Sequence, residues 1–156
     1  MSGSAWKVED LVPHRDGMSL LDRVESVDID ARALTAVFRP EKAKAFASPV
    51  GVPNWVALEV MAQAAAALAG VADRIADPGA APRPGVLMGT RRLKLAEKDF
   101  LPGAEYRVTA KEEVEAAAAA AFACAIEGPD GEEVASAILS AFRPPDFKAF
   151  IREISG

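Results

Sequence analysis

The sequence has few of the side chains that build metal sites and disulfides. Its 156 residues contain one histidine, His14, and one cysteine, Cys124. An intrachain disulfide is therefore excluded, and a zinc or iron–sulfur site of the usual histidine and cysteine type cannot be assembled. We expect no metal. A lone thiol among small apolar residues favours a core position and a reducing, cytoplasmic setting.

Positive charge is also in short supply. The formal net charge is −5 and the isoelectric point is near 5.0. Nucleic-acid binding needs a broad excess of lysine and arginine to neutralise phosphates, so this class of function is excluded. An anionic partner would have to dock on a local basic patch, and one such concentration contains Arg91, Arg92, Lys94 and Lys98.

Long apolar runs are missing as well. No uninterrupted stretch reaches the roughly 18 apolar residues that span a bilayer, and residues 1–7 lack the apolar core of a signal peptide. We therefore expect a soluble protein without a membrane partner. With 51% hydrophobic residues, a chain of this length can bury one core, which predicts a single domain at 1–156. Its core should lie at about 11–143, followed by a short tail at 144–156.

What the chain does contain is a regular succession of strand and helix patterns. Residues 6–11 and 147–154 predict short helices. Residues 112–125 are rich in alanine, which favours helix, but a helix there would leave the strand after the turn at 128–131 without a partner. Strands are thus predicted at 20–28, 31–39, 86–95, 104–114, 118–126 and 134–142. Two strands, one helix and four more strands predict an α+β fold, with an antiparallel sheet wrapped around a long central helix.

The central helix is predicted over residues 53–71, which are apolar on nearly every face and should be buried on all sides. Asn54 is the candidate cap at its start. Glu59 carries the one charge inside the run, and a buried carboxylate is costly unless it is paired, hydrogen-bonded or protonated. This favours a functional role for Glu59. Gln63, one turn later, could steady that carboxylate or simply tie the helix to the sheet.

Three motifs resemble the 3-hydroxyacyl-[acyl-carrier-protein] dehydratases, which have the hot-dog fold. Leu-Val-Pro-His-Arg at 11–15 and Leu-Asp-Arg-Val at 21–24 resemble the opening of that family. Glu-Val-Met-Ala-Gln-Ala at 59–64 is similar to its helix motif, and Phe-Leu-Pro-Gly at 100–103 is similar to its Val-x-Pro-Gly turn. Order and spacing agree from about residue 11 to residue 143.

The resemblance implies removal of water from a 3-hydroxyacyl thioester carried on the phosphopantetheine of an acyl carrier protein or on CoA, without any other cofactor. Glu59 matches the position of the family's helix carboxylate. The family's loop histidine falls on Ala45, so the chain resembles a subgroup without that histidine. This subgroup reads Val-Pro-Asn-Trp, as at 52–55, and Gly-Thr-Arg-Arg, as at 89–92.

The candidate catalytic residues are Glu59 and His14, although a lone histidine in a loop commonly bonds only to backbone. N–H groups at the helix start could polarise a thioester carbonyl, and the arginines could receive an acidic carrier. The candidate substrate-binding residues are Asn54, Trp55, Gln63, Gly89, Arg91 and Arg92.

Three functions stay open. The chain could be a dehydratase, a hot-dog thioesterase that uses the helix carboxylate, or a non-catalytic subunit that binds an acyl carrier and pairs with a histidine-bearing relative. An exposed sheet edge and an apolar helix face predict a homodimer, or a higher oligomer, for each of them.

Overall fold

The computed structural model describes residues 6–12, 19–82, 86–116, 119–142 and 152. His14 lies outside the described residues, as does nearly all of the helix expected at 147–154.

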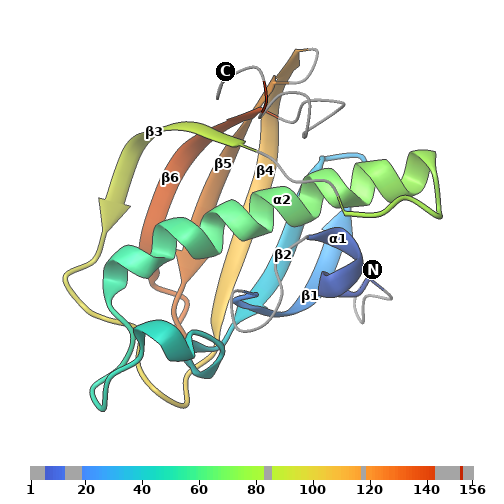
Figure 1. Cartoon of the computed structure of the whole chain (residues 1–156). Helices are drawn as coiled ribbons and strands as arrows, with labels where there is room; N and C mark the ends of the chain where they lie inside the picture. The colour runs from blue at the N-terminus through green and yellow to red at the C-terminus, as the bar shows by residue number, and fades with distance from the viewer. Residues whose placement is uncertain (1–5, 13–18, 83–85, 117–118, 143–151, 153–156) are drawn as a thin grey trace.

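A six-stranded antiparallel sheet curves around one long helix, α2 (Figure 1). The strand order is β1-β2-β4-β5-β6-β3, so β1 and β3 form the two edges. Every strand predicted from the sequence is present, and the predicted wrapping of the sheet around the helix is confirmed. The elements are α1 (Val8–Leu11), β1 (Leu21–Asp28), β2 (Ala33–Phe38), α2 (Ala57–Ala76), β3 (Val86–Leu95), β4 (Tyr106–Ala116), β5 (Ala119–Glu127) and β6 (Glu133–Phe142).

The alanine-rich segment forms strand because its neighbours pair with it on both sides. β5 is hydrogen-bonded to β4 and to β6, and the turn at 128–131 is closed by the N–H of Gly131 donating to the carbonyl of Gly128 at 2.9 Å. Phe122, Cys124 and Ile126 alternate toward the helix and are buried. Sheet pairing and burial thus override the helix propensity of alanine.

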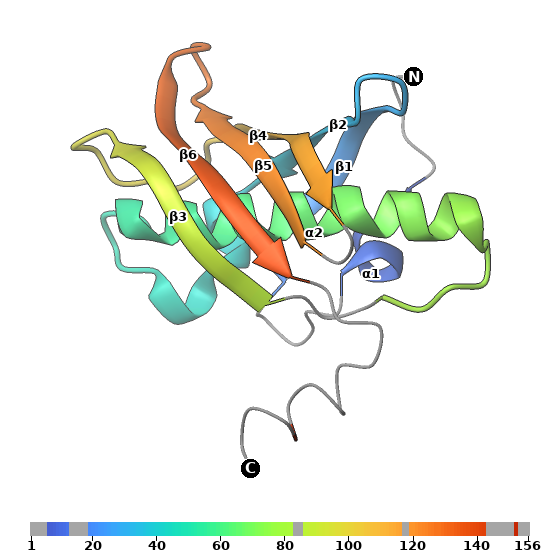
Figure 2. The same cartoon turned by 90° about the horizontal axis from the view of Figure 1, so that it is seen from above.

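Helix α2 crosses the inner face of the sheet (Figure 2) and forms the centre of the core. Together with the turn before it, the segment Asn54–Ala76 is long and apolar enough to span a membrane, but 67% of its 18-residue apolar window is buried in the fold, as expected for a core helix. Burial on all sides was predicted, and this was wrong for one face. A half-buried stripe runs along that face through Leu58, Glu59, Ala62, Ala66 and Ala69.

Three short 3-10 turns carry the chain from β2 to α2. They are η1 (Pro40–Lys42), η2 (Lys44–Phe46) and η3 (Asn54–Val56). The loop at 41–51 is mostly exposed, as predicted, but Ala43 and Gly51 within it are buried. The segment brings residues 45–55 to the start of α2, where Glu59 lies.

Candidate functional site

The site centres on two side chains one turn apart on α2. The amide Nε2 of Gln63 donates to Oε1 of Glu59 at 3.1 Å. The amide oxygen of the same Gln63 accepts the backbone N–H of Leu20 at 2.8 Å. Because that oxygen is engaged, the NH₂ group must point toward the carboxylate. Gln63 therefore both anchors the helix to the start of β1 and orients Glu59, so the two sequence interpretations hold together.

Gln63 and Glu59 differ in their exposure to solvent. Gln63 is completely buried, at 0% exposure, whereas Glu59 is half-buried on the partly covered stripe of α2. A fully buried amide thus holds a partly exposed carboxylate and restricts its direction.

Asn54 does not cap the helix, so the prediction of a capping side chain was wrong. Its Nδ2 donates to the carbonyl oxygen of Ala96 at 2.7 Å, and its backbone N–H donates to Oδ1 of Asp99 at 2.9 Å. Both donors are thus engaged with the β3–β4 connection. The backbone N–H of Asn54 is consequently not available to polarise a thioester carbonyl in this arrangement.

Trp55 stands at the same helix start and is 58% exposed. Its ring meets Phe46 edge-on, with ring centroids 5.5 Å apart and planes at 82°. This contact holds turn η2 against η3, and Ala45, the position that matches the family's loop histidine, is the residue before Phe46. Ala45 is exposed, and its side chain is only a methyl group.

The loop before the helix is fastened to the Phe-Leu-Pro-Gly turn. Val52 and Phe100 exchange two backbone hydrogen bonds, with N···O distances of 2.9 and 2.8 Å. The hydroxyl of Tyr106 accepts the N–H of Leu101 at 2.8 Å. Glu41 accepts the N–H of Gly103 at 2.6 Å, and this bond lowers the pKa of the Glu41 carboxyl. The motifs at 52–55 and 100–103 are therefore one structural unit.

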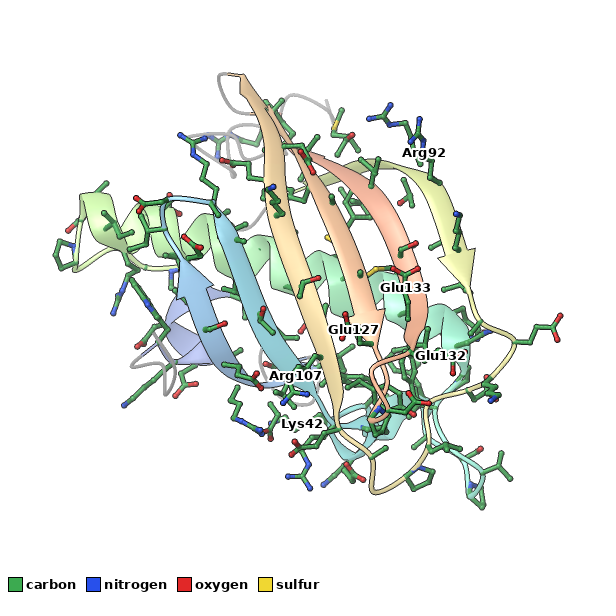
Figure 3. All side chains as sticks on the ribbon, turned by 180° about the vertical axis from the view of Figure 1, so that it is seen from behind. Lys42, Arg92, Arg107, Glu127, Glu132 and Glu133 are labelled. Atoms are coloured by element: carbon green, nitrogen blue, oxygen red, sulfur yellow. The ribbon has the colours of Figure 1, made fainter. Side chains whose placement is uncertain are left out.

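The structure places Gly89, Arg91 and Arg92 on edge strand β3, where all three are exposed. Arg92 has a positive φ of 54° within a register shift between Arg91 and Lys94, and its side chain lines a groove on the face of the sheet opposite α2 (Figure 3). The sheet thus separates the Arg92 side chain from the helix that carries Glu59.

Cys124 is a core residue, as the sequence indicated. It is buried, and burial raises the pKa of its thiol to about 12. Such a thiol stays protonated at neutral pH and is a poor nucleophile. Within the described ranges, no three histidine, cysteine, aspartate or glutamate side chains come together as metal ligands.

Sequence reasoning missed the backbone N–H of Leu20 and the carboxylate of Asp99 as parts of the site. Leu20 lies 43 residues from its partner Gln63, and Asp99 lies 45 residues from its partner Asn54. Spacing patterns within a helix or strand cannot predict contacts between residues so far apart in the sequence. The Asp99 contact had one indirect cue, because it directly precedes the turn motif at 100–103.

Solved structures with a similar fold include dehydratases and thioesterases. The structure of the dehydratase heterocomplex ApeI:P from Xenorhabdus doucetiae matches with a TM-score of 0.85 and 21% identity, over 98% of this chain and 100% of that chain. A hypothetical thioesterase from Streptococcus pneumoniae with coenzyme A matches with a TM-score of 0.57 and 9% identity, over 78% and 84%. The E. coli PaaI protein from the phenylacetic acid degradation operon matches at 0.55 and 12%, over 77% and 81%.

At these identities the structural matches establish the hot-dog fold, which confirms the prediction from the sequence. No curated protein sequence matches the chain. The profile of a protein family does match, over residues 6–152, and its description is ApeP dehydratase. This match confirms the resemblance to dehydratases. The chain belongs to the ApeP-like dehydratase family.

Proposed function

We propose that the chain contributes Glu59 to the dehydration of a 3-hydroxyacyl thioester, within a site completed by a second subunit. The observation that carries the proposal is the Gln63–Glu59 hydrogen bond at 3.1 Å, with Gln63 itself fixed by the N–H of Leu20. A carboxylate held in one direction by a buried amide has the pre-organisation that acid–base catalysis needs.

The reaction converts a 3-hydroxyacyl thioester into a 2-enoyl thioester and water. A proton leaves the carbon next to the carbonyl, the bond between the third carbon and its hydroxyl breaks, and a carbon–carbon double bond forms. One group must accept the proton and one must protonate the departing hydroxyl. Glu59 can fill one of these roles, and a second acid–base group is required for the other.

This chain offers no second group of that kind at the position the family uses. Ala45 occupies it, next to the Phe46–Trp55 contact. A homodimer, expected from the sequence, would bring together two copies without the histidine. We therefore propose a mixed dimer in which a relative supplies a histidine, and the solved ApeI:P dehydratase supports this because it is a heterocomplex.

The edge strand β3 is the surface we propose for that partner. Leu87, Met88 and Leu93 are 44%, 65% and 44% exposed there, which is unusual for an edge open to water. The acyl group would arrive on an acyl carrier protein or on CoA. The basic residues Arg91 and Arg92 remain the proposed contact for the acidic carrier.

A spectroscopic dehydration assay tests the proposal. The purified chain, a histidine-bearing relative and their mixture are each given a 3-hydroxyacyl thioester, and formation of the conjugated enoyl thioester is followed by absorbance. The mixture should turn over, and Glu59→Gln in this chain should reduce the rate by about 10²–10⁴-fold. Glu127→Gln, an equal change on the outer face of β5, should not. Full activity with Glu59→Gln would refute a role for this carboxylate.

The same samples separate the two other candidates. Release of free thiol from an acyl thioester, abolished by Glu59→Gln, would identify a thioesterase. Tight binding of an acyl carrier without enoyl product or free thiol, in the mixture as well as alone, would identify a non-catalytic subunit.

A further inference from the structure

Two turns lie side by side at the end of the molecule where α2 begins (Figure 1). The turn at 48–51 is closed by two backbone hydrogen bonds between Ser48 and Gly51, with N···O distances of 2.9 and 3.1 Å. It is fastened to the turn at 100–103 by the Val52–Phe100 pair, and a Cβ atom built at Gly51 would lie 2.1 Å from the carbonyl oxygen of Phe100. The two turns form one unit, which we call the tip (residues 48–51 and 100–103).

The tip exposes apolar side chains that the core does not use. Val50 is 75% exposed and Leu101 is 58% exposed. Pro49 and Pro102 beside them are exposed as well, and Trp55, at the adjoining helix start, is 58% exposed. A set of neighbouring apolar side chains left open to water marks an interaction surface.

The positive charges beside the tip come from three exposed lysines, Lys42, Lys44 and Lys98. Lys42 and Lys44 lie in turns η1 and η2, and the contact between Phe46 and Trp55 holds η2 against the helix start. Lys98 lies in the connection that leads from β3 into the turn at 100–103. Within the ranges that the structure describes, none of the three lysines forms an ion pair. Their charges are therefore available to an anionic partner.

The acidic side chains near these lysines are largely engaged within the chain. Glu41 and Asp99 accept backbone N–H groups at 2.6 and 2.9 Å, and Glu105 is paired with two arginines. Glu97 is exposed beside Lys98 and weakens the positive charge of this end. An apolar centre with unpaired lysines around it is the result.

The shape of the tip favours a lipid surface over a protein. A stable protein–protein contact buries about 800 Å² on each partner, whereas here a few apolar side chains stand on two narrow turns. A lipid interface needs no matching shape. Apolar side chains enter it to a depth of roughly 5–10 Å, lysines meet the anionic headgroups, and tryptophan is favoured at the boundary.

We propose that the tip binds reversibly to the surface of an anionic lipid membrane, with Val50 and Leu101 inserted and Trp55 at the level of the headgroups. The sequence predicted no membrane partner because no segment spans a bilayer, but surface binding needs no such segment. The net charge of −5 opposes binding through the rest of the surface, so the contact orients the chain with the start of α2 toward the lipid. This contact goes beyond the proposed dehydration and does not depend on it.

Sedimentation with lipid vesicles tests the contact. The purified chain should sediment with vesicles of equal parts phosphatidylcholine and phosphatidylglycerol, and it should stay in solution with phosphatidylcholine alone or in high salt. The double variant Val50→Asp and Leu101→Asp should lower the affinity by about tenfold or more, because the inserted side chains become charged. Ile29→Asp, which replaces an apolar side chain that is 59% exposed in the β1–β2 turn, should bind as the wild type does. Glu97→Lys should bind more tightly.

Tryptophan fluorescence locates the contact on the molecule. The chain has two tryptophans, so Trp6→Phe leaves Trp55 as the reporter. Its emission should shift to shorter wavelength with the anionic vesicles, and thermal unfolding of each variant checks that the fold is retained.

The proposal is overturned if the wild-type chain stays in solution with anionic vesicles, if Ile29→Asp loses as much binding as the double variant, or if the emission of Trp55 does not shift. A shift caused by an acidic acyl carrier protein, with none caused by vesicles, would make the tip a protein-docking surface and would also overturn it.

Discussion

Gln63 connects Glu59 to Leu20 through one amide group. The amide nitrogen lies 3.1 Å from the Glu59 carboxylate, and the amide oxygen lies 2.8 Å from the backbone nitrogen of Leu20. The direction of the carboxylate on α2 is thereby linked to the entry of β1, and the link is completely buried at Gln63. Stability and activity should both depend on this side chain.

Replacing Gln63 with leucine keeps the volume but removes both hydrogen bonds. The buried N–H of Leu20 then has no acceptor from this side chain, which should cost about 1–3 kcal/mol in the free energy of unfolding. The rate of dehydration should fall as well, with kcat affected more than KM, because the carboxylate loses its direction. Urea denaturation and steady-state kinetics of the mixed complex measure the two effects.

Glu59→Gln serves as the comparison for that experiment. It leaves the bond between Gln63 and Leu20 in place, so its stability should stay within about 0.5 kcal/mol of the wild type while activity is lost. Equal loss of stability in both variants would show that the Leu20 anchor is not what Gln63 contributes.

Asn54 can be tested as a tie to the β3–β4 connection. A capping role would tolerate Asn54→Asp, because aspartate caps helices as well as asparagine does. The observed role needs an amide N–H for the carbonyl of Ala96, and aspartate would place a carboxylate beside that carbonyl and near Asp99. We expect Asn54→Asp to lose about 1 kcal/mol or more, at least as much as Asn54→Ala, in urea unfolding. A stable Asn54→Asp variant would favour the capping role.

Local patterns predicted the elements well and the contacts between them poorly. Alternation and turn residues gave all six strands, including the alanine-rich β5, because the turn at 128–131 required a partner for β6. Spacing of four residues predicted the Glu59–Gln63 bond on one helix face. Asn54 was misread because a helix cap and a loop tie both favour asparagine. Only the fold could reveal which acceptor it reaches.

The face on which Arg92 lies was also beyond local reasoning. A regular strand would alternate Arg91 and Arg92 between the two faces, one toward the helix and one away from it. The bulge at Arg92 breaks that alternation. A bulge depends on how a strand pairs with its neighbour, here β6, so the sequence of β3 alone does not predict it.

At Gly70, helix α2 lies close against the backbone of α1. A Cβ atom built there would lie 2.4 Å from the carbonyl oxygen of Leu11, which is backbone and cannot move aside alone. Alanine in a helix interior usually gains about 1 kcal/mol over glycine, but the clash should outweigh that gain. We expect Gly70→Ala to lower the midpoint of thermal unfolding. Gly79→Ala, where the nearest atom is 3.6 Å away, should leave it nearly unchanged.

The Cys124 thiol gives the fold a specific sensitivity to alkali. Burial raises its pKa from an ordinary value of 9.0 to about 12 in the folded chain. The folded state therefore holds the proton more tightly than the unfolded state. Its contribution to stability is complete below pH 9 and is lost as the pH rises toward 12.

The free energy of unfolding should accordingly fall between pH 8 and pH 10 by more in the wild type than in Cys124→Ala. Lysine and tyrosine residues titrate in both proteins, so the difference between the two slopes isolates the thiol. Urea midpoints at several pH values measure it. The thiol should also react slowly with a disulfide reagent until urea unfolds the chain, and rapid modification of the folded protein would contradict the buried position of Cys124.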